Sequence, residues 1–214
     1  GSAARPGARA WRQRRGAVVS AISRFHIEIS TPERKIEVDL RPLNESAWDR
    51  SRRVIARRAT GFEMRVLYCD ATPASAEREQ ELHASRVEMD TLLGDSDYVV
   101  VQVPYLPATH HLIGASQLGR MKNTSVLIHA GRGGVVDDAA LAAALKTGTI
   151  AGAGIDCCEN EPGVHPDLPA CPNVLFTPHI GSATPATRMN MVSLALRNLA
   201  VGLQGGIPPN VVNG

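Results

Sequence analysis

The feature that most constrains this chain is a regular alternation of short apolar runs and helical segments, which begins at residue 64. The runs are short enough to be strands, and single helical segments separate them. They are Met64–Tyr68, Tyr98–Val103, Ser125–His129, Gly154–Cys157 and Val174–Thr177. Strands that alternate with helices form βαβ units, whose right-handed crossovers give a parallel sheet. The pattern therefore predicts an α/β fold with a doubly wound parallel sheet.

Two helices in this region carry clear boundary signals. Segment 139–146 follows Asp137 and Asp138, either of which can cap a helix N-terminus, and Gly148 stops it. The last helix starts at Thr184-Pro185, where a capping threonine precedes proline at the first helical position. Its apolar stripe consists of Val192, Leu196, Leu199 and Leu203. These boundaries predict a central domain over residues 46–184 and a C-terminal helix and tail over 185–214.

Residues 1–45 lack this organisation and are expected to form an irregular, arginine-rich tail. Within them, the apolar residues of 27–29 and 36–40 alternate on either side of a turn-like segment, Thr31–Arg34. That arrangement is typical of a β-hairpin. The next segment, residues 50–60, has a helical and very basic pattern.

Composition limits the classes of protein to which the chain can belong. Apolar residues make up 43% of it and aromatic residues only 4%, so the core is expected to be aliphatic, as in buried parallel strands. A net charge of +2 does not favour nucleic acid as the main partner, and no apolar run is long enough to span a bilayer. The four cysteines form no CxxC pair, which argues against a disulfide framework or a zinc site and favours the reducing interior of a cell.

Charge is distributed unevenly along the chain. Residues 1–27 contain six arginines and no acidic residue, so the remainder carries a net charge of −4. An acid-free, arginine-rich leader is similar to an organellar transit segment, and the alternative is a disordered tail. We therefore expect an intracellular protein that is cytoplasmic, or organellar if this segment is a transit signal.

Polar residues that directly follow the predicted strands are the candidate site, because a doubly wound sheet binds its ligand at the carboxyl ends of its strands. Asp70 follows the run 64–68. A carboxylate there can accept hydrogen bonds from both ribose hydroxyls of a dinucleotide such as NAD, and it would repel the extra phosphate of NADP. The alternative is an ordinary turn aspartate.

Three further polar positions follow later strands. Arg132 lies among glycines in the segment 129–134, where small neighbours allow a ligand to approach and a guanidinium can pair with a carboxylate. Asp156 directly follows the segment Gly152-Ala153-Gly154-Ile155, and Glu161 comes five residues later. His179 follows the fifth run and can exchange a proton with an alcohol oxygen, with a nearby carboxylate to hold it. The alternative readings are a surface arginine and a structural histidine.

Several spaced motifs together resemble the coenzyme domain of the D-isomer-specific 2-hydroxyacid dehydrogenases, which includes glyoxylate, hydroxypyruvate, phosphoglycerate and D-lactate dehydrogenases. The similar region runs from Arg57 to Asn213, nearly three quarters of the chain. The motifs are Ala56-Arg57-Arg58-Ala59, Gly61–Asp70, Ser96-Asp97 through Thr109, His129–Asp137, Ala151–Pro162 and Thr177–Thr184. The resemblance implies a Rossmann-like coenzyme domain with NAD as cofactor and a small 2-keto or 2-hydroxy acid as substrate, in a protein that forms a homodimer.

The resemblance also implies roles for individual residues. Arg132 would bind the substrate carboxylate, and His179, paired with Glu161, would act as the acid-base group. The remaining implied residues would contact the cofactor. Asp70 would hold the adenosine ribose, Val103, Pro104 and Thr109 would line the adenine side, Asp156 would contact the nicotinamide carboxamide, and the backbone at Ala130 and Gly181 would approach the cofactor. No metal ligand is implied.

The chain departs from the family in two places. The glycines of the family's GxGxxG loop should fall at Ala47, Asp49 and Arg52, and none is glycine. With Pro42 inside it, segment 36–46 is also a poor first strand, so the first βα unit is expected to be degenerate. The family's substrate domain is expected to be largely missing, which leaves open a fragment, a splice product or a faulty gene model. The leading hypothesis is an NAD-dependent 2-hydroxyacid dehydrogenase with impaired activity, and the alternative is a non-catalytic relative or truncated pseudoenzyme that acts as a binding module.

Overall fold

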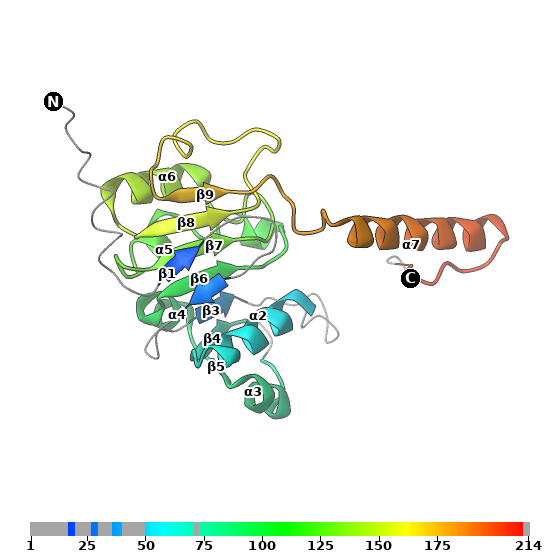
Figure 1. Cartoon of the computed structure of the whole chain (residues 1–214), viewed down its shortest axis with the longest axis horizontal. Helices are drawn as coiled ribbons and strands as arrows, with labels where there is room; N and C mark the ends of the chain where they lie inside the picture. Colours follow the sequence, from blue (N-terminus) through cyan, green and yellow to red (C-terminus); the bar gives the residue numbers. More distant parts are fainter. Residues whose placement is uncertain (1–16, 20–26, 30–35, 40–49, 71–72, 212–214) are drawn as a thin grey trace.

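The computed structural model describes residues 17–19, 27–29, 36–39, 50–70 and 73–211 (Figure 1). Seven strands form one sheet in the order β5-β4-β3-β6-β7-β8-β9, and all six neighbouring pairs are parallel. The strands are β3 (Ile36–Asp39), β4 (Val66–Cys69), β5 (Ala84–Arg86), β6 (Tyr98–Val101), β7 (Val126–His129), β8 (Gly152–Ile155) and β9 (Val174–Phe176). The predicted doubly wound parallel sheet is confirmed, and each of the five predicted runs contains a strand or overlaps one.

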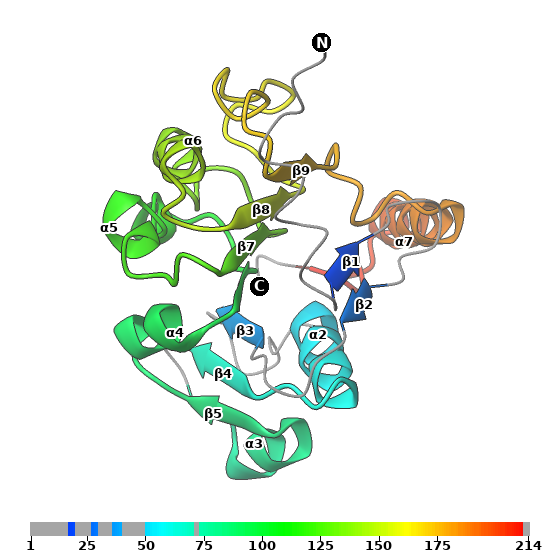
Figure 2. The same ribbon diagram turned by 60° about the vertical axis from the view of Figure 1, so that its left-hand side comes forward.

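Helices cover both faces of this sheet (Figure 2). They are α2 (Arg50–Gly61), α3 (Ala76–Leu82), α4 (Met89–Asp95), α5 (Ala115–Leu118) and α6 (Asp138–Thr147). The chain also has a 3-10 turn, η1, at Pro107–Thr109 and a last helix, α7, at Pro185–Leu203. Helices α4, α5 and α6 bury one core cluster with Val99 and Val101, whereas α2 and α3 bury a second cluster with Val100. Successive valines of β6 thus face opposite cores, which is why the strand is apolar throughout.

The predicted helix boundaries follow their local signals. The Asp137 side chain accepts a hydrogen bond from the Ala140 amide at the start of α6, and Gly148 ends that helix in the left-handed region at φ 72°. The Thr184 hydroxyl accepts from the Thr187 amide, with Pro185 in the first turn of α7. Both helices therefore begin where capping chemistry predicts, and α6 also ends where it predicts.

The predicted β-hairpin is wrong. Strand β2 (Ile27–Ile29) pairs antiparallel with β1 (Ala17–Val19), whereas β3 lies between β4 and β6 in the main sheet. The sheet therefore includes a strand from the segment that was expected to be irregular tail, and the domain starts before residue 46. Residues 40–49, which include Pro42 and two of the expected loop glycine positions, lie outside the described residues.

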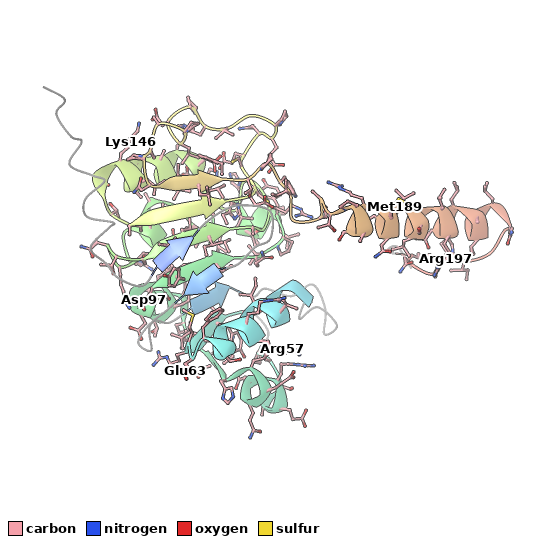
Figure 3. The ribbon with its side chains drawn as sticks, in the orientation of Figure 1. Arg57, Glu63, Asp97, Lys146, Met189 and Arg197 are labelled. Atoms are coloured by element: carbon pink, nitrogen blue, oxygen red, sulfur yellow. The ribbon has the colours of Figure 1, made fainter. Side chains whose placement is uncertain are left out.

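Helix α7 extends away from the sheet and its helices (Figure 1). None of its residues is buried, and its predicted apolar stripe is exposed, with Leu196 60% and Leu203 80% accessible. Figure 3 shows its side chains, including Met189 and Arg197, standing out around the helix. None of the helices in the described part of the chain combines the length and apolar character that a membrane crossing requires.

Candidate active site

The carboxyl edge of the sheet gathers the polar positions that follow the strands. The strand order reverses at β3, whose neighbours are β4 and β6, and such a switch point opens the crevice in which doubly wound folds bind ligands. Asp70 follows β4 on one side of this point and is 3% exposed. The loop after β6 lies on the other side, and the loops after β7, β8 and β9 continue along the same edge.

The loop after β7 holds Arg132 through close backbone contacts. A Cβ atom on Gly131 would lie 2.9 Å from the Val103 carbonyl oxygen, and one on Gly133 would lie 1.9 Å from that of Cys158. The glycines therefore let neighbouring loops approach one another, rather than making room for a ligand. Arg132 itself is exposed, and its Nη1 donates to the Gly131 carbonyl at 2.8 Å.

His179 and Glu161 form the predicted pair. The distance from His179 Nδ1 to Glu161 Oε2 is 2.7 Å, and the Cys158 amide donates to the other carboxylate oxygen, Oε1, at 3.0 Å. Partial burial raises the pKa of Glu161, but the hydrogen bonds from His179 and from the Cys158 amide outweigh it and hold that pKa below its ordinary value. The carboxylate is therefore ionised and can orient the imidazole.

Backbone strain marks the same histidine. His179 has φ 52°, in the left-handed region that favours glycine, and its amide donates to the Thr177 carbonyl at 3.0 Å. A non-glycine residue keeps such a conformation only where its surroundings enforce it.

Hydrogen bonds to Asp156 hold His179 in this left-handed conformation. Its Oδ1 accepts from the Thr177 hydroxyl at 2.5 Å and from the Ile180 amide at 2.9 Å, and its Oδ2 accepts from the Gly181 amide at 3.2 Å. The carboxylate at the end of β8 thus fixes the loop on both sides of His179. This positioning role was not predicted from the sequence, which assigned Asp156 only to the cofactor.

Cys157 lies between the arginine and the acid-base pair. Its thiol donates to the Gly131 carbonyl at 3.3 Å, and its Sγ is 4.0 Å from His179 Nδ1. Arg132 is close enough to act on the charge of this thiol, and burial, its largest influence, raises the pKa of Cys157 to about 11. The acid-base pair therefore lies beside one buried sulfur atom, and Arg132 is next in the chain to Gly131, to which that thiol donates. A hollow of about 460 Å³ opens beside them, lined by residues that include Glu161, Phe176 and His179.

The residues predicted on the adenine side shape their loop. The Thr109 hydroxyl donates to the Pro104 carbonyl at 2.8 Å and accepts from the Leu106 amide at 2.7 Å, and both Thr109 and Val103 are 1% exposed. Any contact with a ligand would have to come from the backbone of this loop and from Pro104. After the neighbouring strand, β7, the Ala130 carbonyl accepts from the Gln102 side chain at 3.1 Å.

Two histidines were not singled out by sequence reasoning. His129, at the end of β7, is 1% exposed, and neither ring nitrogen has a hydrogen-bond partner within the described part of the chain. Burial lowers the pKa of His129 to about 4, so this ring is neutral. His111 lies 2.6 Å from Glu159 and 3.7 Å from Asp137, in an acidic cluster at the start of α6. A lone histidine in a sequence carries no signal for either environment.

Comparisons with known proteins identify the family of this domain. The family model described as "D-isomer specific 2-hydroxyacid dehydrogenase, NAD binding domain" matches residues 52–181. Glyoxylate reductase from Thermococcus onnurineus is 47% identical over 159 residues, which cover 74% of this chain and 47% of that protein. Glyoxylate/hydroxypyruvate reductase B from Pectobacterium carotovorum subsp. carotovorum is 47% identical over 161 residues, covering 74% of this chain and 50% of its own.

A solved structure is also similar to this chain. The holo form of D-mandelate dehydrogenase from Rhodotorula graminis aligns with a TM-score of 0.70 and 35% identity over 80% of this chain and 49% of that one. The chain thus spans about half the length of the relatives it matches. These three relatives are named as enzymes, and none is described as a non-catalytic binding protein.

NAD is the cofactor of the matched domain, and the described carboxyl edge fits it. A buried carboxylate at Asp70 stands beside the switch point, where a ribose would lie, and the Gly181 backbone is exposed beside Asp156 at the opposite end. The segment that would cradle the pyrophosphate departs from the family pattern, since Ala47, Asp49 and Arg52 replace its glycines.

Proposed function

Because this chain belongs to the D-isomer specific 2-hydroxyacid dehydrogenase family, we propose that it takes part in hydride exchange between NAD and a small 2-keto or 2-hydroxy acid. One observation carries the proposal. The Glu161–His179 hydrogen bond of 2.7 Å lies at the carboxyl edge of the sheet, beside the loop that holds Arg132. An ionised carboxylate, an imidazole and a guanidinium at one edge suit a substrate that has both a carboxylate and an exchangeable alcohol proton.

Arg132 is proposed to bind the substrate carboxylate. A guanidinium has five N–H donors, and the hydrogen bond from Nη1 to Gly131 uses one of them. The remaining donors can form a bidentate pair with a carboxylate, which fixes the plane of the substrate. The same charge would polarise the adjacent keto group.

His179 is proposed to move the proton. Glu161 engages Nδ1, so Nε2 is the ring atom left to give a proton to the keto oxygen or to take one from the alcohol. The hydrogen bond with Glu161 also orients the imidazole, so that Nε2 faces the substrate when His179 acts as the acid in the reducing direction. NAD, when bound in its reduced form, supplies the hydride that C2 of the acid receives.

The remaining site residues are proposed to hold NAD. Asp70 would accept hydrogen bonds from the adenosine ribose, and the loop containing Val103, Pro104 and Thr109 would border the adenine. Ala130 and Gly181 would approach the nicotinamide end through their backbones. Asp156 would reach the carboxamide with lone pairs that its bonds to the His179 loop leave available.

The test is NADH oxidation by the 214-residue chain with glyoxylate, hydroxypyruvate or pyruvate, at NADH concentrations where the rate is linear in NADH. The slope then reports stabilisation of the transition state, and ratios between variants remain meaningful even for a slow enzyme. We expect turnover below about 1 per second, because the described residues form one wall of the cleft and near-attack geometry needs both.

Three variants make the comparison specific. His179→Gln should lower the slope about 100- to 10,000-fold, the usual contribution of general acid-base catalysis. Arg132→Ala should lower it by at least tenfold, and Arg120→Ala, which removes an exposed arginine paired with Asp90, should leave it unchanged. Equal slopes for wild type, His179→Gln and Arg132→Ala would refute the proposed roles.

The cellular location remains part of this proposal. We propose an intracellular protein, cytoplasmic unless the arginine-rich segment 1–27 acts as a transit signal. Most of that segment lies outside the described residues. Expressing the chain with a C-terminal fluorescent protein, with and without residues 1–27, separates the two locations.

A further inference from the structure

Three side chains of different chemistry meet at the acid-base pair. His179 Nδ1 lies 4.0 Å from Cys157 Sγ and 2.7 Å from Glu161 Oε2, and one donor atom from each residue lies within 4.8 Å of the others. We propose that Cys157, Glu161 and His179 form a binding site for a thiophilic divalent cation such as Zn²⁺, and that the bound cation disables the acid-base pair.

The donor set suits zinc. Thiolate sulfur, imidazole nitrogen and carboxylate oxygen are its protein ligands, and three of them with a solvent molecule complete a tetrahedron. The thiolate also selects against Mg²⁺ and Ca²⁺, which prefer oxygen ligands. The sequence argued against zinc only because it lacks CxxC pairs. Here the donors come from the loops after two neighbouring strands, β8 and β9.

The spacing is close to what coordination needs. Zinc–nitrogen and zinc–oxygen bonds of about 2.0–2.1 Å at a tetrahedral angle place those two donors about 3.3 Å apart, and a zinc–sulfur bond of about 2.3 Å places sulfur about 3.6 Å from nitrogen. The present distances are 2.7 Å and 4.0 Å. Each pair must move by only about half an ångström, within the reach of side-chain rotation.

Access and charge also favour a cation. The side chains of His179 and Glu161 are 41% and 36% exposed, so an ion can enter from solvent, while the sulfur of Cys157 lies beneath them. Asp156 and Glu161 add negative charge near that sulfur, which opposes a thiolate and attracts a cation. On binding, a zinc–sulfur bond replaces the S–H bond, and the thiol proton passes to solvent.

Binding would change the chemistry of His179. Coordination through Nδ1 ends its hydrogen bond to Glu161, so that carboxylate no longer orients the ring for proton transfer. The expected loss of turnover rests on the proposed function, but metal binding itself does not. A spectroscopic experiment can therefore test the site whether or not the chain is catalytic.

The experiment titrates the reduced, purified chain with Co²⁺ and follows the ultraviolet thiolate-to-cobalt absorption, with competition by Zn²⁺. The wild type should show one absorbing site per chain. Cys157→Ala should abolish the band and weaken Zn²⁺ binding at least tenfold, since loss of even an outer partner of a metal site costs 10–100-fold. Cys158→Ala removes the neighbouring sulfur, which belongs to the buried core cluster, and should keep the band.

His179→Gln provides a second readout that does not depend on the cysteine. It should retain the thiol but weaken Co²⁺ binding by a similar factor, and circular dichroism checks that each variant is folded. A band that survives in Cys157→Ala, or the absence of any band in the folded wild type, would overturn the site. Metal binding in a chain that oxidises no NADH would support the site while refuting the proposed function.

Discussion

Gly133 offers the most direct test of how the site is held together. A Cβ atom there would lie 1.9 Å from the Cys158 carbonyl oxygen, 2.7 Å from its carbonyl carbon and 3.2 Å from the Glu159 nitrogen. All three are backbone atoms, so no side-chain rotation can relieve the overlap. Gly133→Ala must therefore push the two loops apart by about 1.5 Å or more, the distance needed to restore an ordinary contact.

The loss in unfolding free energy follows from the hydrogen bonds that those two loops make. The Cys158 amide donates to Glu161, and the Glu159 amide donates to Asp138 at 3.0 Å, so both hydrogen bonds resist the displacement. Overpacking usually costs about 1–3 kcal/mol, and rigid backbone on both sides favours the upper end. For a domain of this size, about 3 kcal/mol corresponds to a fall in Tm of roughly 6–12 °C.

The assay is urea unfolding at neutral pH, with Gly154→Ala as the matched control. The control makes the same substitution in β8, where a new Cβ meets nothing within 4 Å, so it should be neutral or stabilise by up to about 1 kcal/mol. Gly133→Ala should also lower turnover by about 100-fold or more, since a misplacement of even about 1 Å can cost that much by misaligning the reacting groups. A Gly133→Ala unfolding free energy within about 0.5 kcal/mol of wild type would refute this packing argument.

Four further outcomes are expected. Burial raises the pKa of Asp138 to about 6, so the folded chain retains a proton that the unfolded chain releases above about pH 4. The free energy of unfolding should therefore lose about 3 kcal/mol from this group between pH 4 and 6, and urea unfolding of Asp138→Asn should lack that slope. Burial lowers the pKa of His129 to about 4, so the unfolded chain takes up the proton first as the pH falls below about 6.5. The free energy of unfolding should therefore fall by about 3 kcal/mol because of His129 when the pH is lowered to about 4. A His129→Phe variant whose unfolding free energy falls as much as that of wild type would contradict this expectation. Calorimetry should give an NADH Kd weaker than about 1 mM, because side chains replace the phosphate-binding glycines, and Asp49→Gly should tighten it; micromolar affinity in the wild type would refute this. Sedimentation velocity should show a homodimer, because α7 exposes apolar side chains along its length, and a monomer at micromolar concentration would count against it.

The sequence predicts the second half of the sheet well because its signals are local. A parallel strand buried on both faces is a continuous apolar run, and Tyr98–Val101 is found inside the predicted run 98–103. Capping residues such as Asp137 and Thr184 act on amides two or three residues away, so their positions fix helix starts without tertiary information.

The first half was harder to predict because its partners are distant in sequence. Segment Ile36–Asp39 alternates apolar and acidic residues, which is typical of a half-buried hairpin strand. Its actual partners are β4, about thirty residues away, and β6, about sixty residues away. Strand β5 has only three residues, Ala84–Arg86, and lies at the edge of the sheet, so it carries almost no pattern at all.

Residue type and placement after strands were enough to identify the candidate site, but not its supporting contacts. Arg132, Glu161 and His179 could be proposed because parallel strands end at one edge. The roles of Asp156 and Cys157 depend on which loops touch, and that depends on the registers of β7, β8 and β9. The glycines beside Arg132 were interpreted as room for an approaching ligand, whereas the close contacts of Gly131 and Gly133 are with protein backbone.

These contacts link the two halves of the proposed chemistry. Gly133 is next to Arg132 in the chain and packs against the Cys158 carbonyl, while the Cys158 amide donates to Glu161, which holds His179. The group proposed to bind the substrate carboxylate and the group proposed to move its proton are therefore linked through one residue, Cys158, whose carbonyl meets Gly133 and whose amide holds Glu161. Cys157 continues the same link, since its thiol donates to Gly131 and its sulfur lies near His179. A cation bound at that sulfur would act on the residue that joins the arginine loop to the acid-base pair, so it would affect both at once.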